Sequence, residues 1–150
     1  MYESIKQPKI PPPFWFIACA ALVYATPAII PFTAPLWIIA PFILSACGIA
    51  AISLWQFHVV KTTVHPLQLE KTSVLVTNGI YRISRNPMYL SLLLLLISWC
   101  LYLGSLGGLL GVILFVFIIN ELHIKPEEKV LTEYFGNQYR EYQRKVRRWV

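Results

Sequence analysis

Four apolar stretches divide this chain, and they restrict its fold more than any other feature of the sequence. They run over residues 14–30, 36–57, 88–103 and 106–124. A helix needs about 17 to 25 apolar residues to cross roughly 30 Å of hydrocarbon, so the last two stretches lie near the short end of that range. Hydrophobic residues make up 57% of the 150 residues and charged residues only 13%. The sequence therefore predicts an all-α, single-domain, polytopic integral membrane protein with four transmembrane helices.

The basic residues predict which side of the membrane each connection faces. Two lysines precede the first span, four Lys and Arg residues lie between the second and third, and seven follow the fourth. The connections at 31–35 and 104–105 carry no charge. The positive-inside rule then places both termini and the loop over 58–87 in the cytoplasm, at the inner membrane if the cell is bacterial. The net charge of +6 indicates contact with anionic lipid and not with nucleic acid, because the basic residues flank spans.

Small residues within the spans are interpreted as packing positions. Cys19, Cys47 and Cys100 all fall inside spans, and no two of them form a C-x-x-C pair, so we expect neither a disulfide framework nor a metal site. Glycines recur where the third and fourth spans meet, at Gly104, Gly107, Gly108 and Gly111. Their G-x-x-x-G spacings would let these two helices approach closely.

A polar cassette over residues 79–89 separates the second and third apolar stretches. It reads Gly-Ile-Tyr-Arg-Ile-Ser-Arg-Asn-Pro-Met-Tyr. Gly79 follows an asparagine and predicts a turn with positive φ. Asn86 is pushed toward extended geometry by Pro87, which suits the first turn of a helix, so Tyr89 should lie in that turn. The free N–H groups at this helix start favour an anion such as a carboxylate.

A second polar island follows the fourth span. Glu121 and His123 lie where the helix leaves the bilayer, and ionisable groups at that depth are candidates for function. Glu121 has a structural alternative, a surface pair with Lys125. Glu127 shares a helical face with His123 and follows Pro126, which predicts a helix start there. Glu127 would then face the cassette. The alternative is that it only stabilises the positive end of the helix dipole.

The segment over residues 126–148 predicts a cytoplasmic amphipathic helix. Its apolar residues are spaced by four, four, three and four positions, at Leu131, Phe135, Tyr139, Tyr142 and Val146. Gly136 and Asn137 predict a break into two helices. The basic residues on the other faces favour contact with anionic headgroups.

Three motifs in fixed order resemble the isoprenylcysteine carboxyl methyltransferase and phospholipid methyltransferase superfamily, in particular its short bacterial members. They are residues 75–81 followed by 85–89, then Glu127-Glu128, then residues 135–139. The resemblance covers about residues 61–149. It implies an integral membrane enzyme that uses S-adenosylmethionine from the cytosol, methylates a lipophilic substrate arriving through the bilayer and releases S-adenosylhomocysteine.

The resemblance also implies a set of cofactor-binding residues. Matching positions are Gln68, Ser73, Val74, Leu75, Val76, Tyr81, Asn86, Pro87, Tyr89 and Glu127. Residue chemistry adds two further candidates to this set. Gly79 allows the turn, and Arg85 is a cation suited to the cofactor carboxylate. Two positions depart from the family pattern. Asn86 stands where many members have histidine, and His123 stands where the prenylcysteine enzymes carry a substrate-binding arginine.

The chemistry of a sulfonium cofactor agrees with these residues. Aromatic faces such as Tyr81 and Tyr89 stabilise a cation by roughly 0.5 to 2 kcal/mol each. Glu127 is a natural partner for the cofactor ammonium. If the acceptor must lose a proton, His123 or Glu121 is the nearest candidate base.

Several alternatives stay open from the sequence alone. The acceptor is a phospholipid amine, a lipophilic thiol or carboxylate, or a small volatile thiol. The rival functions are a membrane reductase of the sterol-reductase type that uses NADPH, and a non-enzymatic assembly or transport subunit.

Overall fold

The computed structural model describes residues 10–27, 31–60, 74–104 and 106–150. The described residues form helices and the segments that connect them, as predicted. The α-helices are α1 (Pro12–Ala25), α2 (Leu36–Val60), α3 (Pro87–Leu103), α4 (Leu109–Ile119), α5 (Lys125–Phe135) and α6 (Asn137–Lys145). Short 3-10 helices cover Gly79–Arg82 and Leu106–Gly108, and a π-helical turn over Asn120–Ile124 joins α4 to α5.

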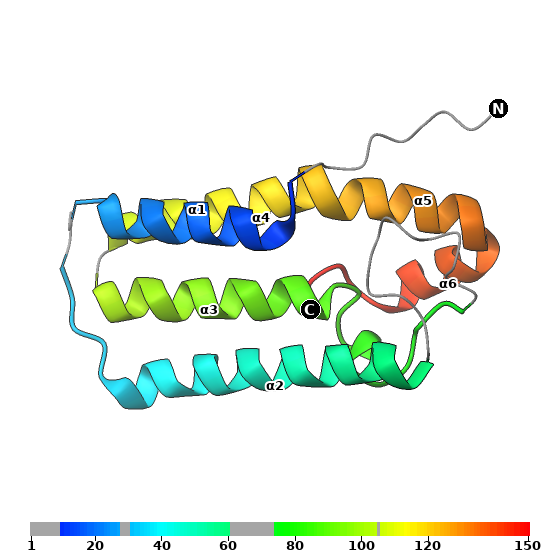
Figure 1. Cartoon of the computed structure of the whole chain (residues 1–150), viewed down its shortest axis with the longest axis horizontal. Helices are drawn as coiled ribbons and strands as arrows, with labels where there is room; N and C mark the ends of the chain where they lie inside the picture. Colours follow the sequence, from blue (N-terminus) through cyan, green and yellow to red (C-terminus); the bar gives the residue numbers. More distant parts are fainter. Residues whose placement is uncertain (1–9, 28–30, 61–73, 105) are drawn as a thin grey trace.

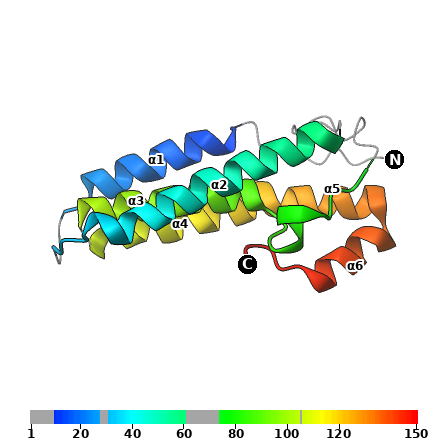
Figure 2. The ribbon, with the colours of Figure 1, turned by 90° about the horizontal axis from the view of Figure 1, so that it is seen from below.

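Helices α1, α3 and α4 pack against one another, and α2 lies along α3 (Figures 1 and 2). The core between them is apolar and contains the fully buried side chains of Leu96, Phe115, Ile119 and Ile124. Trp99 of α3 also donates its indole N–H to the Ala20 carbonyl of α1, at 3.1 Å. Helix α5 extends beyond this bundle in line with α4, and α6 turns back toward the end of α3 (Figure 1).

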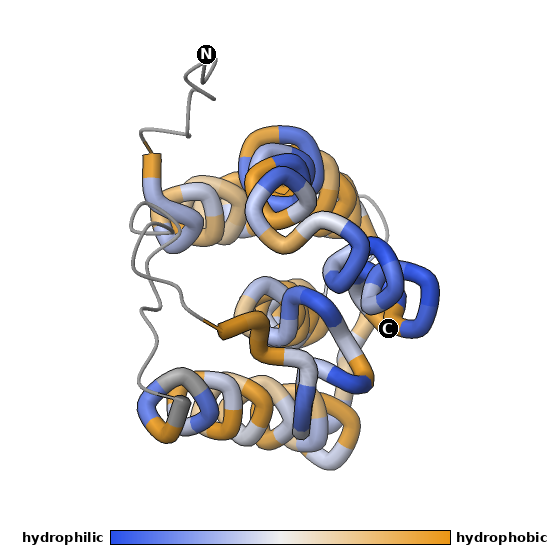
Figure 3. Tube along the Cα trace, turned by 90° about the vertical axis from the view of Figure 1, so that its right-hand side faces the viewer, coloured by the Kyte–Doolittle hydropathy of each residue, from blue (hydrophilic) through white to orange (hydrophobic). Residues whose placement is uncertain are grey.

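The described residues include two helices long and apolar enough to cross a membrane, Leu36–Gln56 and Leu106–Phe135, and the shorter helices α1 and α3 are also apolar. Much of the outer surface of α2 and α4 is apolar, including Trp37 at 75% exposure and Phe117 at 63%. Many exposed apolar side chains on these helices are consistent with contact with lipid or with another protein. The hydrophilic residues collect at one end of the bundle (Figure 3).

The first predicted span ends earlier than expected. Helix α1 stops at Ala25, although the sequence predicted a span to residue 30. Thr26 has an extended backbone with ψ at 127°, which is the geometry that a following proline imposes, and Pro27 is next in the chain. Helix α2 instead continues past residue 57 to Val60.

Helix α5 begins at Lys125 and is not a free helix end, although its first turn contains Pro126 as predicted. The residues before Pro126 keep right-handed helical dihedrals, with φ and ψ of −65° and −48° at Ile124 and −61° and −46° at Lys125. One helix therefore runs from α4 into α5. The wider π turn ends just before the proline, whose ring clashes with the carbonyl four residues earlier in a regular α-helix. Glu127 therefore does not lie at a free helix N-terminus, where it could stabilise the positive end of a helix dipole.

The glycines at the start of α4 approach α1 as well as α3, so the predicted pairing of the third and fourth spans describes only part of their packing. A Cβ at Gly111 would lie 2.6 Å from Val23 Cγ2 of α1. A Cβ at Gly108 would lie 2.9 Å both from Val23 Cγ1 and from Cys100 Sγ of α3. These contacts require glycine because a side chain would push the helices apart.

Gly104→Ala tests the connection between α3 and α4. Gly104 has φ at +64°, and a Cβ there would lie 2.0 Å from the Phe32 carbonyl oxygen. We expect this substitution to lower the free energy of unfolding by about 1 to 3 kcal/mol, measured in detergent. Gly48→Ala is the control, because a Cβ at that position in α2 meets nothing within 4 Å. An equal response of the two variants would contradict the proposed packing.

Candidate functional site

The cassette begins with a turn that only glycine fits. Gly79 has φ at +61°, as the sequence predicted, and a Cβ on it would lie 1.6 Å from Gln56 Nε2 of α2. The same Gln56 amide donates to the Asn78 carbonyl at 3.1 Å. The 3-10 turn over Gly79–Arg82 follows and carries Tyr81 inward, where it is buried.

The end of the cassette starts α3 at the predicted residue. Asn86 lies outside the helical region with φ at −130°, Pro87 is the first residue of α3, and Leu90 N–H donates to the Asn86 carbonyl at 3.0 Å. Tyr89 therefore lies in the first turn of α3. The first N–H groups of an α-helix have no partner within the helix, and the start of α3 lies at the polar end of the bundle.

Tyr89 and Glu127 meet across the gap between α3 and α5. The Tyr89 hydroxyl donates to Glu127 Oε1 at 2.5 Å. Glu127 is partly buried, and no described residue forms an ion pair with it. His123 lies beside them, with its ring centroid 6.1 Å from that of Tyr89. It is 2% exposed, and its Nε2 has no hydrogen-bond partner among the described residues.

A second cluster of buried residues covers the cassette from the side of α6. It consists of Tyr81, Tyr139, Tyr142 and Val146, with Leu131 and Phe135 packed against it. The apolar stripe predicted for the C-terminal segment thus lies within this cluster. The Tyr142 hydroxyl donates to the Tyr81 carbonyl at 2.6 Å. The break predicted after Phe135 is also present, at Gly136 with φ at +54°.

The phenols of this cluster stay protonated at physiological pH. Burial raises the pKa of Tyr81, and the neighbouring Tyr142 and the Glu127 carboxylate raise it further. Burial, followed by the charge of Glu128, raises the pKa of Tyr139 to about 12. These hydroxyls therefore act as hydrogen-bond donors.

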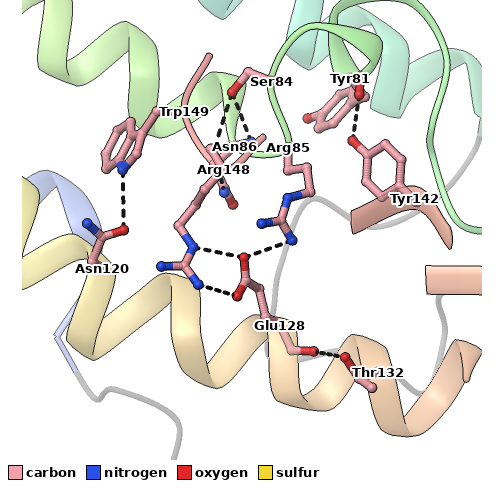
Figure 4. A network of polar contacts seen from close by, with 10 residues as sticks. All are labelled: Tyr81, Ser84, Arg85, Asn86, Asn120, Glu128, Thr132, Tyr142, Arg148 and Trp149. Atoms are coloured by element: carbon pink, nitrogen blue, oxygen red, sulfur yellow. Dashed lines mark hydrogen bonds and ion pairs between the residues drawn. The ribbon is translucent and has the colours of Figure 1, made fainter. Parts of the chain in front are cut away.

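Glu128 is held by two arginines (Figure 4). Arg85 Nη1 of the cassette lies 3.0 Å from Glu128 Oε1, and the side chains are 11% and 13% exposed. Arg148 binds the same carboxylate in a bidentate manner, with Nε 3.0 Å from Oε1 and Nη2 2.6 Å from Oε2. The hydrogen bonds to Glu128 raise the pKa of Arg148. Arg85, expected at the cofactor carboxylate, is thus engaged with Glu128, although its buried Nε has no hydrogen-bond partner among the described residues.

The last residues of the chain run against the cassette. The Arg147 carbonyl accepts from Arg85 N–H at 3.0 Å, and the Arg148 carbonyl accepts from Asn86 Nδ2 at 3.0 Å. Trp149 Nε1 donates to Asn120 Oδ1 of the π turn at 3.3 Å (Figure 4). Sequence reasoning missed these contacts. Arg148 is one of several basic residues near the C-terminus, and no local pattern distinguishes it.

The remaining predicted residues are spread over the same end of the bundle. Leu75 and Val76 pack against the tyrosine cluster and Val74 is exposed, whereas Gln68 and Ser73 lie outside the described residues. Glu121 forms an exposed ion pair with Lys125, 2.5 Å apart, as the structural alternative for this residue predicted. Within the described part of the chain, no three His, Cys, Asp or Glu side chains are grouped to hold a metal.

Comparison with known proteins defines the class to which this fold and site belong. The sequence model of the phospholipid methyltransferase family matches residues 36–138. The chain belongs to this family, whose members use S-adenosylmethionine, and the family predicted from the motifs is thereby confirmed.

Two relatives and the solved structures complete the comparison. An uncharacterised protein of Haemophilus influenzae is 52% identical over 63 residues, which are 42% of this chain and the whole of that protein. The protein-S-isoprenylcysteine O-methyltransferase of Saccharomyces cerevisiae is 36% identical over 92 residues. That match covers 59% of this chain and 35% of the yeast enzyme. No solved structure matches the chain significantly.

Proposed function

We propose that this protein is an S-adenosylmethionine-dependent methyltransferase that acts on a lipophilic or membrane-delivered acceptor. The observation that carries the proposal is the Tyr89–Glu127 pair, which joins the cassette to α5 at the polar end of an apolar bundle. Membership of the phospholipid methyltransferase family supports methyl transfer over reduction with NADPH and over a non-enzymatic role.

The residues at this end fit the charges of the cofactor. S-Adenosylmethionine carries an ammonium and a sulfonium, and Glu127 is a carboxylate that no described cation neutralises. Burying such a group without a cation is unfavourable, so a cationic ligand stabilises it. Tyr81 and Tyr89 would offer ring faces to the sulfonium. The free N–H groups at the start of α3 and the Nε of Arg85 would suit the cofactor carboxylate.

When bound, the cofactor would supply a methyl carbon that its sulfonium activates for attack by the acceptor. The chain itself needs only to align the acceptor with that carbon and to exclude water. Tyr89 orients the Glu127 carboxylate through its hydrogen bond. The tyrosine cluster closes the site on the side of α6.

His123 is the proposed residue on the acceptor side. It is buried beside Tyr89, and its unpartnered Nε2 can accept the proton that an amine or thiol acceptor releases on methylation. Glu121 is less suited to this step because its carboxylate is exposed and paired with Lys125. A carboxylate acceptor would need no base at all.

The site would lie at the cytoplasmic face of the membrane. The apolar outer surfaces of α2 and α4 support a bundle of four spans. The basic residues around the cassette and after α5 support a cytoplasmic position for this end and for both termini. An acceptor could then enter from the bilayer while the cofactor enters from the cytosol.

Glu127→Ala tests the cofactor site. S-Adenosylhomocysteine should raise the unfolding temperature of the wild type in detergent, and NADPH should not. We expect the substitution to weaken S-adenosylhomocysteine binding by about 10- to 100-fold, since a hydrogen bond to a charged group contributes roughly 1.5 to 3 kcal/mol. Glu133→Ala removes an exposed carboxylate of the same helix and is the control. Unchanged affinity in Glu127→Ala would remove this residue from the site, and stabilisation by NADPH alone would favour the reductase.

His123→Gln tests the acceptor side. The variant should bind S-adenosylhomocysteine like the wild type but transfer methyl groups about 10²- to 10⁴-fold more slowly, the range typical of a lost general base. The assay uses a methyl-labelled donor with a total lipid extract and with small thiols. His58→Gln, an exposed histidine at the end of α2, is the control. Full activity in His123→Gln would exclude this residue as the base.

A further inference from the structure

We propose that Arg148 is a positioning residue that holds the two halves of the cofactor site in register. One half is the cassette with Asn86 and Tyr89, and the other is α5 with Glu127. Arg148 reaches the first half through its backbone carbonyl and the second through its guanidinium. The inference rests on the proposed function and assigns to the C-terminal residues a role in building that site.

The backbone of the last residues fixes the cassette. Asn86 Nδ2 donates to the Arg148 carbonyl at 3.0 Å, and Ser84 Oγ approaches the same oxygen at 3.5 Å. The Arg147 carbonyl accepts from Arg85 N–H at 3.0 Å. Three consecutive residues of the cassette, 84–86, are therefore held by the backbone carbonyls of Arg147 and Arg148. The Asn86 amide, which matches a cofactor position of the family, is oriented by this contact directly before α3 begins.

The guanidinium fixes α5. Arg148 binds both oxygens of Glu128, and bidentate pairs of this kind restrain direction as well as distance. Glu127 and Glu128 are neighbours on one helix, so their side chains leave the axis about 100° apart. Holding Glu128 toward the C-terminal residues therefore sets the rotation of α5 that turns Glu127 toward Tyr89. The two acidic residues have different roles, Glu128 in positioning and Glu127 in binding.

The residues on either side of Arg148 keep it in place. Trp149 packs against the apolar core of the bundle and donates to Asn120 in the π turn. Val146 is buried in the tyrosine cluster. The short stretch between them is thus anchored at both ends, which allows one residue in it, Arg148, to contact the cassette through its backbone and α5 through its side chain (Figure 4).

Arg147 provides a matched control for Arg148. Its side chain is exposed, and only its backbone carbonyl contributes to the cassette. Arg147→Ala therefore removes the same charge, one residue away, while leaving the backbone contact available. Arg148→Lys keeps the charge but loses the bidentate geometry.

The test compares these variants of the full chain in detergent. Calorimetric titration gives the affinity for S-adenosylhomocysteine, thermal unfolding without ligand gives stability, and the methyl-transfer assay separates KM for the donor from kcat. Arg148→Ala should weaken S-adenosylhomocysteine binding by about tenfold or more and raise KM more than it lowers kcat, as expected when a charge-assisted pair is lost. Arg148→Lys should recover part of the affinity. Arg147→Ala should stay within about twofold of the wild type, the factor that roughly 0.4 kcal/mol supplies.

Each outcome separates this inference from the function on which it rests. If Arg148→Ala binds as tightly as Arg147→Ala, or lowers only the unfolding temperature, Arg148 has no positioning role while the proposed function stands. If Arg148→Ala does not fold, wild-type affinity in Arg148→Lys, measured at a similar unfolding temperature, overturns the inference. Failure of the wild type to bind S-adenosylhomocysteine refutes the proposed function and this inference with it.

Discussion

The polar end of this protein depends on one carboxylate shared by two arginines. Glu128 of α5 binds Arg85 from the cassette and Arg148 from the C-terminus, so segments far apart in the sequence meet at one point. The carboxylate and Arg85 are nearly buried, and each charge there is acceptable only because its partners are present. The apolar helices provide a rigid bundle. At its polar end the Glu128 network joins the cassette to α5, beside the Tyr89–Glu127 hydrogen bond and the tyrosine cluster.

The residues of the proposed site lie next to this Glu128 network. Glu128 is occupied by arginines, whereas the neighbouring Glu127 receives only the Tyr89 hydroxyl among its described contacts and is available for a cation. His123 lies one helical turn before Glu127, and the π turn that contains it joins the apolar and polar parts of one continuous helix. The result is a carboxylate, aromatic rings and a buried imidazole gathered where the apolar bundle ends. This combination suits the proposed methyl transfer from a cationic donor.

Features governed by local chemistry could be predicted from the sequence, and contacts between distant segments could not. Pro87 starts α3 and Gly79 makes its turn because their own backbone preferences require it. The stripe from Leu131 to Val146 was visible from helical spacing, and the pair between Glu121 and Lys125 is a neighbour contact on one helix. Pro126 correctly predicted the first turn of α5, but its local preference does not reveal the π turn that joins α4 and α5 in one continuous helix. The pair between Glu128 and Arg148 joins residues 20 apart through tertiary folding, and spacing alone does not single it out.

The most direct test is photolabelling of membrane vesicles with methyl-labelled S-adenosylmethionine, followed by peptide mapping. In inside-out vesicles, label should appear on peptides that contain Tyr81, Tyr89 or Glu127, and excess S-adenosylhomocysteine should remove it. Right-side-out sealed vesicles should remain unlabelled, because the proposed function places the site at the cytoplasmic face. Label confined to other parts of the chain, or equal labelling from both sides, would contradict a cytoplasmic methyl-donor site between the cassette and α5.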